Sequence, residues 1–143
     1  MKCRRCGKKM GEAATLPHEI IVGGTKFVGE LKGRKCASCD AAEISLNELT
    51  RFEDAVARRL AESGPVSGAT LRYMRKSVPL SAVELASLLR VAPETISRWE
   101  TGEREVDRAA WLVVRALVLE PGSKAALAEV RDEPPARAVA IAV

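Results

Sequence analysis

The clearest hydrophobic pattern lies in residues 80–102 and predicts two short helices joined by a tight turn. Apolar residues recur there at helical spacing, and the pattern stops at residues 90–92. Pro93 restarts it, because a proline at the first helical position loses no needed N–H and has its φ preset. Ile96 and Trp99 are three residues apart and should face inward. The second helix therefore keeps one polar face outward.

Two serines mark the starts of helices. Ser81 with Glu84, and Ser45 with Glu48, have the capping-box spacing, in which a hydroxyl and a carboxylate satisfy free backbone amides. The second pair opens an apolar stripe at three- and four-residue steps, which predicts a helix of about four turns. The stripe consists of Leu46, Leu49, Phe52, Val56 and Leu60. We expect this helix to pack on the sheet that precedes it or to continue toward the next domain.

The helices around residues 80–102 differ in how apolar they are. Leu71, Met74 and Val78 form one apolar face before the pair, and Ser123 opens a short last helix after it. Between them lies a helix that is more apolar than one core face requires. Its apolar residues are Ala109, Ala110, Leu112, Val113, Ala116, Leu117 and Leu119. Either this helix is buried in its own domain, or it forms the seam of a homodimer.

A period-two pattern near the N-terminus predicts a β-hairpin. Residues 19–22 and 25–28 are strand-like, and the two-residue loop Gly23-Gly24 joins them. Residues 29–35 should continue as an extended segment. The fold class is thus α+β, with a small β module and a helix followed by an all-α domain of five helices.

The clearest linker signal is Ser63-Gly-Pro-Val-Ser-Gly68, with two glycines and a proline in six residues. We therefore expect four segments, and their composition sets their bounds. They are a module at 1–62, a linker at 63–68, a helical domain at 69–130 and a tail at 131–143.

Four cysteines form two C-x2-C pairs, and this spacing predicts a metal site. Cys3 pairs with Cys6, and Cys36 pairs with Cys39. Two such knuckles supply four thiolates at the corners of a tetrahedron, which suits one structural Zn²⁺. A rubredoxin-like iron site uses the same ligands, but the chain has almost no aromatic shell for it. A thioredoxin-type motif needs a βαβ setting, and catalytic zinc needs an open position; we expect neither, and no enzyme activity. His18, the only histidine, is expected in a solvated loop.

The charge suits an anionic partner. The net charge is +4 and the pI about 9.0, and residues 1–36 carry nine Lys or Arg against three acids. These basic residues either offset the thiolate charge or face an acidic partner or nucleic-acid phosphate. No apolar run has the length of a membrane span, and no signal peptide is recognisable. We therefore expect a cytoplasmic protein. The cytoplasm is reducing, and cysteines there bind metal more often than they form disulfides.

The segment P-E-T-I-S-R-W-E-T-G resembles the second helix and exit of the Cro/lambda-repressor-like helix-turn-helix family, the XRE type. The resemblance covers residues 69–120 and implies that this helix enters the major groove of double-stranded DNA. It implies contacts to bases or phosphates from Glu94, Thr95, Ser97 and Arg98, and Arg104 just beyond the helix is a phosphate candidate. The resemblance also implies a structural ion pair between Arg75 and Glu100.

Two positions depart from that family. Ala82 replaces a glutamine that braces against DNA, and Arg90 replaces the glycine of the turn. Arg90 must either adopt a left-handed conformation or use a reshaped turn.

The order of the modules resembles the MqsA-type antitoxins, which begin with a YgiT-type zinc finger. The opening M-K-C-x-x-C, the second C-x-x-C and S-R-W-E-T-G carry this resemblance over residues 1–120. It implies a structural zinc, a ribonuclease toxin bound by the zinc module, and a homodimeric second domain that represses the operon. Glu94 departs from that family, which uses an asparagine there to read bases.

Three functions remain open at this point. The first is a zinc-containing DNA-binding repressor of the antitoxin type. The second is a stand-alone XRE-family regulator or protein-interaction adaptor with no toxin. The third, an enzyme or redox protein that uses the cysteines, predicts an iron chromophore or redox-active thiols.

Overall fold

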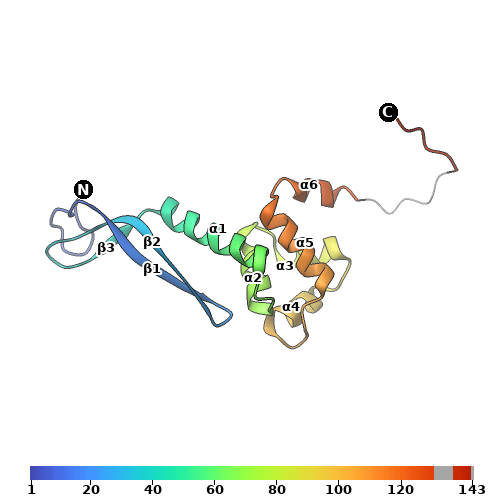
Figure 1. Cartoon of the computed structure of the whole chain (residues 1–143), viewed down its shortest axis with the longest axis horizontal. Helices are drawn as coiled ribbons and strands as arrows, with labels where there is room; N and C mark the ends of the chain where they lie inside the picture. The colour runs from blue at the N-terminus through green and yellow to red at the C-terminus, as the bar shows by residue number, and fades with distance from the viewer. Residues whose placement is uncertain (131–136, 143) are drawn as a thin grey trace.

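The computed structural model describes residues 1–130 and 137–142, and residues 131–136 and 143 of the expected tail lie outside the described residues. A three-stranded antiparallel sheet is followed by helices, which confirms the α+β class (Figure 1). The strands are β1 (Ala13–Val22), β2 (Thr25–Lys35) and β3 (Ala42–Ile44). The helices are α1 (Leu46–Ser63), α2 (Gly68–Ser77), α3 (Ala82–Leu89), α4 (Pro93–Thr101), α5 (Arg108–Leu119) and α6 (Ser123–Ala128). None of the described helices has the length and apolarity needed to cross a membrane.

The predicted hairpin is confirmed, and its strands are longer than expected. Val22 pairs with Thr25 across a two-residue loop. Gly23 and Gly24 have φ of 56° and 81°, and two positive values are what a type I′ turn requires. β1 begins at Ala13 rather than at residue 19, because Leu16 is also buried under the sheet.

The expectation that His18 lies in a solvated loop was wrong. His18 is a half-buried residue of β1 that pairs with Gly29 of β2. Its ring packs edge-on against Phe52 of α1, with centroids 5.1 Å apart. Gly29 makes room for this contact, since a Cβ there would lie only 2.6 Å from the Phe52 ring.

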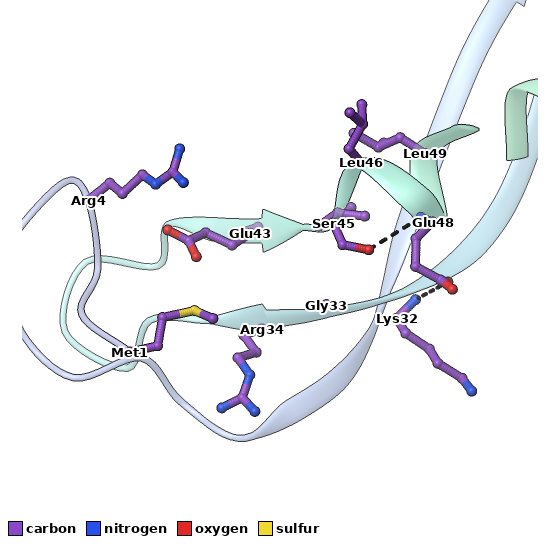
Figure 2. Close-up of a pocket in the computed structure, with 12 residues that line it drawn as sticks. Met1, Arg4, Lys32, Gly33, Arg34, Glu43, Ser45, Leu46, Glu48 and Leu49 are labelled. Carbon is purple, nitrogen blue, oxygen red and sulfur yellow. Dashed lines mark hydrogen bonds between the residues drawn. The ribbon is translucent and has the colours of Figure 1, made fainter. Parts of the chain in front are cut away.

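The start of α1 is joined to the sheet. The Ser45 hydroxyl accepts from the Glu48 N–H at 3.3 Å, as the capping pattern predicts. The Glu48 carboxylate, however, accepts from the backbone N–H of Lys32 at 3.1 Å and from Arg51 at 3.2 Å. Figure 2 shows the two bonds that link Ser45, Glu48 and Lys32. Glu48 thus satisfies a backbone donor of β2 just beyond the residues that pair with β3, and it fixes the helix relative to the sheet.

The other end of α1 belongs to the core of the helical bundle. Val56, Leu60 and Ala61 are buried in the same apolar cluster as residues of α2 to α5. Arg115 of α5 donates to the Ala61 carbonyl at 2.7 Å. Both expected positions of α1 therefore occur, on the sheet and against the next domain. The boundary at residues 63–68 stays a prediction.

The tip of the hairpin also reaches the helical core. Val22 is only 7% exposed and is part of the same cluster. Beside it, Gly23 faces the start of α2, where an added Cβ would lie 3.1 Å from the Ser67 hydroxyl. Ser67 and Thr70 form a reciprocal capping box at that point. The β1–β2 hairpin is therefore anchored at both ends.

α5 divides its apolar residues between two sides. Ala110, Trp111, Val114 and Leu117 are buried in the bundle. Leu112 is 46% exposed, and Ala109 and Ala116, three residues before it and four after it, are exposed as well. An apolar stripe therefore remains on the outside of α5, and the homodimer stays a prediction.

Candidate DNA interface and metal centre

The turn between α3 and α4 is tight and uses a left-handed residue. Arg90 has φ 55° and ψ 46°, so it adopts the left-handed conformation rather than a reshaped turn. A non-glycine residue in this conformation costs about 1–2 kcal/mol. The Val91 N–H donates to the Ala86 carbonyl at 3.0 Å, which closes the end of α3. The turn thereby sets the direction in which α4 starts.

α4 has one buried and one open side. Ile96 is fully buried and Trp99 is 8% exposed. Glu94, Ser97 and Arg98 are exposed, and Thr95 is half-buried. The open side is polar, with hydroxyls, one carboxylate and one guanidinium, and these groups pair with base edges and phosphates.

The chain folds back after α4 and places three charged residues together. Gly102 ends the helix with φ 82°, and the Arg104 N–H donates to the Arg98 carbonyl at 3.1 Å. The Arg98 Nε lies 3.8 Å from the Glu103 carboxylate. Arg104 is exposed beside this pair. A DNA contact by Arg98 would therefore either compete with Glu103 or use the other N–H groups of the guanidinium.

The structure brings Arg75 and Glu100 together behind the open side of α4. The Arg75 Nε donates to the Glu100 carboxylate at 2.6 Å and Nη2 at 3.2 Å, while Nη1 donates to the Leu80 carbonyl at 2.9 Å. Their side chains are 9% and 10% exposed. These bonds hold α2, the end of α4 and the start of the α3 segment in one arrangement.

The two knuckles bring all four cysteine sulfurs together. In the first, the Cys3 N–H donates to the Lys8 carbonyl at 2.7 Å, and Gly7 turns with φ 75°. The Sγ atoms of Cys3 and Cys39 are 3.6 Å apart, and so are those of Cys6 and Cys36. All four sulfurs lie within 4.8 Å of one another.

This sulfur cluster fits a tetrahedral metal ion. Zn–S bonds of about 2.3 Å place sulfurs about 3.8 Å apart, close to the observed separations. The cysteines are free thiols, because 3.6 Å far exceeds a disulfide bond of about 2.05 Å. Backbone amides of Ser38 and Cys39 donate to the Cys36 sulfur and lower its pKa to about 7. Amides of Cys6 and Arg5 likewise lower the pKa of Cys3. Such donors favour thiolate, the form that binds metal, at Cys3 and Cys36. At Cys6 and Cys39 the amide donors of Lys8 and Ala41 are outweighed by desolvation and by hydrogen bonds among the sulfurs, which raise the pKa of Cys6 to about 12 and also raise the pKa of Cys39.

Three contacts in these sites have little signal in the sequence. Glu48 reaches Lys32, and Glu103 reaches Arg98 from outside its helix, so no helical spacing marks either. Ser67 and Thr70 form a capping box with a threonine in place of Glu or Gln, which the usual pattern does not include.

Comparison with known proteins identifies one family model that matches part of the chain. No curated protein matches the chain. The family model described as Helix-turn-helix (HTH_3) matches residues 71–110, from Leu71 in α2 to Ala110 in the first turn of α5. This match includes the α3–turn–α4 unit and the polar side of α4. Residues 71–110 are therefore similar to the XRE-type helix-turn-helix, a family of DNA-binding regulators.

Proposed function

We propose that this protein is a sequence-specific DNA-binding transcriptional repressor that acts in the cytoplasm. The observation that carries the proposal is the polar, open side of α4, which follows a tight turn and rests on a buried ion pair. In the major groove, Arg98 would donate to guanine and Glu94 would accept from a cytosine amine. Thr95, Ser97 and Arg104 supply further base or phosphate contacts.

The supports behind α4 explain how these contacts keep a fixed geometry. The Arg75–Glu100 pair joins α2 to the last turn of α4. Gly68, the first residue of α2, lies so close to α4 that a Cβ would collide with the Trp99 carbonyl. A helix held from behind in this way presents its outer side chains to a groove without first having to become ordered.

The cysteine end supplies a structural zinc site in this proposal. Cys3, Cys6, Cys36 and Cys39 fill all four positions of a tetrahedral ion and leave none for a substrate. The bound ion would supply folding energy for residues 1–45, and we assign it no catalytic role.

A two-fold operator has two half-sites, and we propose a homodimer that supplies one recognition helix to each. The exposed stripe of Ala109, Leu112 and Ala116 on α5 is the candidate seam. A two-fold dimer would place its α4 helices about 34 Å apart, one turn of DNA. The Leu112→Glu variant should elute as a monomer in light-scattering chromatography, and a wild-type protein that is itself monomeric at binding concentrations would exclude this seam.

The function is tested with the DNA that lies upstream of the gene of the protein. Fluorescence anisotropy should show tighter binding to one upstream fragment than to a random duplex. Arg98→Ala should weaken specific binding by about 1–3 kcal/mol if Arg98 reads a base, and all duplexes alike if it contacts phosphate. The matched control is Arg58→Ala, an exposed arginine of α1 whose ion pair, within the described part of the chain, is with Glu62. Equal binding to all duplexes by the wild type at low salt, together with no effect of Arg98→Ala, would refute the proposal.

We further propose the antitoxin form of this repressor, on the order of the two modules and the spacing of the cysteines. Its partner would be a ribonuclease toxin that binds the zinc module. Co-expression with the neighbouring gene tests this, because the antitoxin should restore growth that the neighbour arrests. If no neighbouring product is toxic, the stand-alone XRE-family regulator is the better description. If Arg98→Ala leaves the cellular function intact, the protein-interaction adaptor is the better description.

A further inference from the structure

The chain that leaves α4 turns back and makes three contacts with Arg98. The Arg104 N–H donates to the Arg98 carbonyl at 3.1 Å, and the Thr101 hydroxyl donates to the same carbonyl at 3.3 Å. The Glu103 carboxylate lies 3.8 Å from the Arg98 Nε. Gly102 permits this return, because its φ of 82° is a left-handed conformation that favours glycine. The end of α4 and the turn after it therefore hold both the backbone and the side chain of Arg98.

The contact with Glu103 uses one edge of the Arg98 guanidinium. This group has five N–H donors in a planar fork, one on Nε and two on each Nη. Glu103 stands beside Nε, so the Nη donors can serve another acceptor. The bidentate contact with guanine needs two parallel donors, which the two Nη atoms supply. A base contact by Arg98 is therefore compatible with its ion pair.

An arginine on the open side of a recognition helix has two kinds of target on DNA. It can read the edge of a guanine, or it can contact a phosphate, which carries no sequence information. If Arg98 moved toward a phosphate, Glu103 would either lose its partner beside the DNA or approach the same phosphate and be repelled by it. In the base-reading arrangement the carboxylate keeps its partner. Glu103 therefore disfavours the phosphate contact more than the base contact.

The size of this effect is limited by the exposure of the pair. The side chains of Arg98 and Glu103 are 45% and 67% exposed. An ion pair this exposed contributes at most about a fivefold factor to an equilibrium. The pair thus acts as a bias on the direction of the Arg98 side chain. Such a bias changes which DNA is preferred and leaves the stability of the fold nearly unchanged.

The other acids near Arg98 do not share this contact. Glu94 lies one helical turn before Arg98 in α4, and Glu105 lies two residues beyond Glu103. Both are exposed, and neither forms an ion pair within the described part of the chain. Glu105 therefore offers a charge of the same sign in the same turn without the contact to Nε.

We propose that Glu103 is a positioning residue that determines the specificity of Arg98. It holds the Nε edge so that the Nη groups face a guanine, and it opposes the sequence-independent contact with phosphate. The inference rests on the proposed function. Removal of the carboxylate should weaken the preference for the specific site and add a phosphate contact on DNA of any sequence.

The test compares Glu103→Gln with Glu105→Gln in the full-length, zinc-loaded protein. Both variants remove one negative charge from the turn after α4, but only the first removes the partner of Arg98 within the described residues. Fluorescence anisotropy measures the affinity for the preferred upstream fragment and for a random duplex of equal length. Glu103→Gln should lower the ratio of the two affinities about two- to fivefold. Glu105→Gln should change both affinities alike and keep the ratio.

The salt dependence of binding to the random duplex gives a second readout. In Glu103→Gln the released Arg98 gains a phosphate contact, so the slope of log K against log salt should steepen by about 0.9. Glu105→Gln should leave the slope unchanged. Arg98→Ala/Glu103→Gln should match Arg98→Ala in both ratio and slope, because Glu103 acts through Arg98. Circular dichroism verifies that each variant is folded.

The outcomes separate this proposal from the proposed function. With a wild-type protein that prefers the upstream fragment, an unchanged ratio or an unchanged slope in folded Glu103→Gln would overturn the role of Glu103 alone. An effect that persists in the Arg98→Ala background would do the same. A ratio that falls equally in Glu105→Gln would assign the effect to the net charge of the turn and would also overturn it. A wild-type protein that binds both duplexes equally would overturn the proposed function, and the role of Glu103 with it.

Discussion

The helical end and the cysteine end are held together by different forces. Among the described residues, the helical core contains fifteen buried apolar residues, contributed by α1 to α5, the segment between α2 and α3, and the tip of β1. In the same described part of the chain, the cysteine cluster contains three buried residues, Cys3, Met10 and Cys36, with Cys39 and Ala41 packed against them. A segment this small cannot bury enough apolar surface to fold by that means alone, and metal ligation is the usual remedy. One end of the chain therefore depends on packing and the other on its thiolates.

The helical core contains residues from both sides of the glycine–proline segment at 63–68. Val22 at the hairpin tip and Leu60 in α1 both contribute to the helical core, although both precede that segment. Unfolding of the cysteine end should therefore lower the stability of the helical bundle, through the loss of these few contacts.

Metal removal is expected to have the largest effect. Cys36→Ser should abolish zinc binding and unfold the knuckles and sheet, because metal binding contributes about 10–16 kcal/mol to folding in such modules. The helices α2 to α5 should remain folded, with a lower melting temperature because Val22 no longer covers the core. Zinc analysis and amide NMR measure the two effects separately.

The neighbouring exposed residue Ser38 supplies the control for this experiment. Ser38→Ala lies in the same knuckle and should keep one zinc per chain and the full set of strand signals. A Cys36→Ser protein with full zinc content and an unchanged thermal transition would contradict a metal-dependent cysteine end.

Removal of one partner of the buried Arg75–Glu100 ion pair should have the second-largest effect on stability. Glu100→Ala leaves the Arg75 guanidinium enclosed without its carboxylate, which typically costs about 3–5 kcal/mol. The double variant Arg75→Met/Glu100→Leu should recover most of this loss, because no charge is then left buried. Urea denaturation measures both. A loss below about 1 kcal/mol in the single variant would mean that the pair is effectively solvated.

Truncation in α1 tests whether this helix belongs to the helical core. Leu60 is fully buried, so Leu60→Ala should destabilise the helical bundle by about 2–5 kcal/mol. Leu46→Ala provides a matched control on the same helix, where the side chain is 78% exposed and little should change. If Leu60→Ala and Leu46→Ala both have small effects on the melting of α2 to α5, α1 stabilises the cysteine end and not the helical bundle.

Local signals predicted the α3–turn–α4 unit well. Pro93 starts α4, Gly102 ends it and the Ser81 hydroxyl caps α3, because each of these depends on backbone geometry within a few residues. The sulfur cluster was predictable for a related reason, since C-x2-C fixes two thiolates in one turn. The identity of the metal and the roles of the α4 side chains toward DNA stay predictions.

Contacts between distant segments were harder to predict. The stripe of α1 indicates an apolar face but not which element covers it, and here the sheet and the bundle share it. In α5 the sequence left open whether Leu112 is buried in its own domain or lies in a dimer seam, and it did not mark Trp111 and Val114. The structure buries Trp111 and Val114 and turns Leu112 outward, so only the seam remains for Leu112 as a prediction. The arrival of α1 beside α5, seen in the Arg115–Ala61 bond, helps to decide which side faces inward.

The smallest expected effect concerns the hairpin tip, and it measures how strongly the two ends are coupled. Val22→Ala removes two methyl groups from the shared core, which at about 0.8 kcal/mol each should lower the stability of the helical bundle by about 1.6 kcal/mol. Ile21→Ala is the matched control, because Ile21 is the preceding residue of the same strand and is 65% exposed. Denaturation should be followed by the fluorescence of Trp99 and Trp111, which lie in the helical core. If both variants melt like the wild type, the hairpin tip only rests on α2, and the cysteine end acts on the DNA-binding helices through α1 alone.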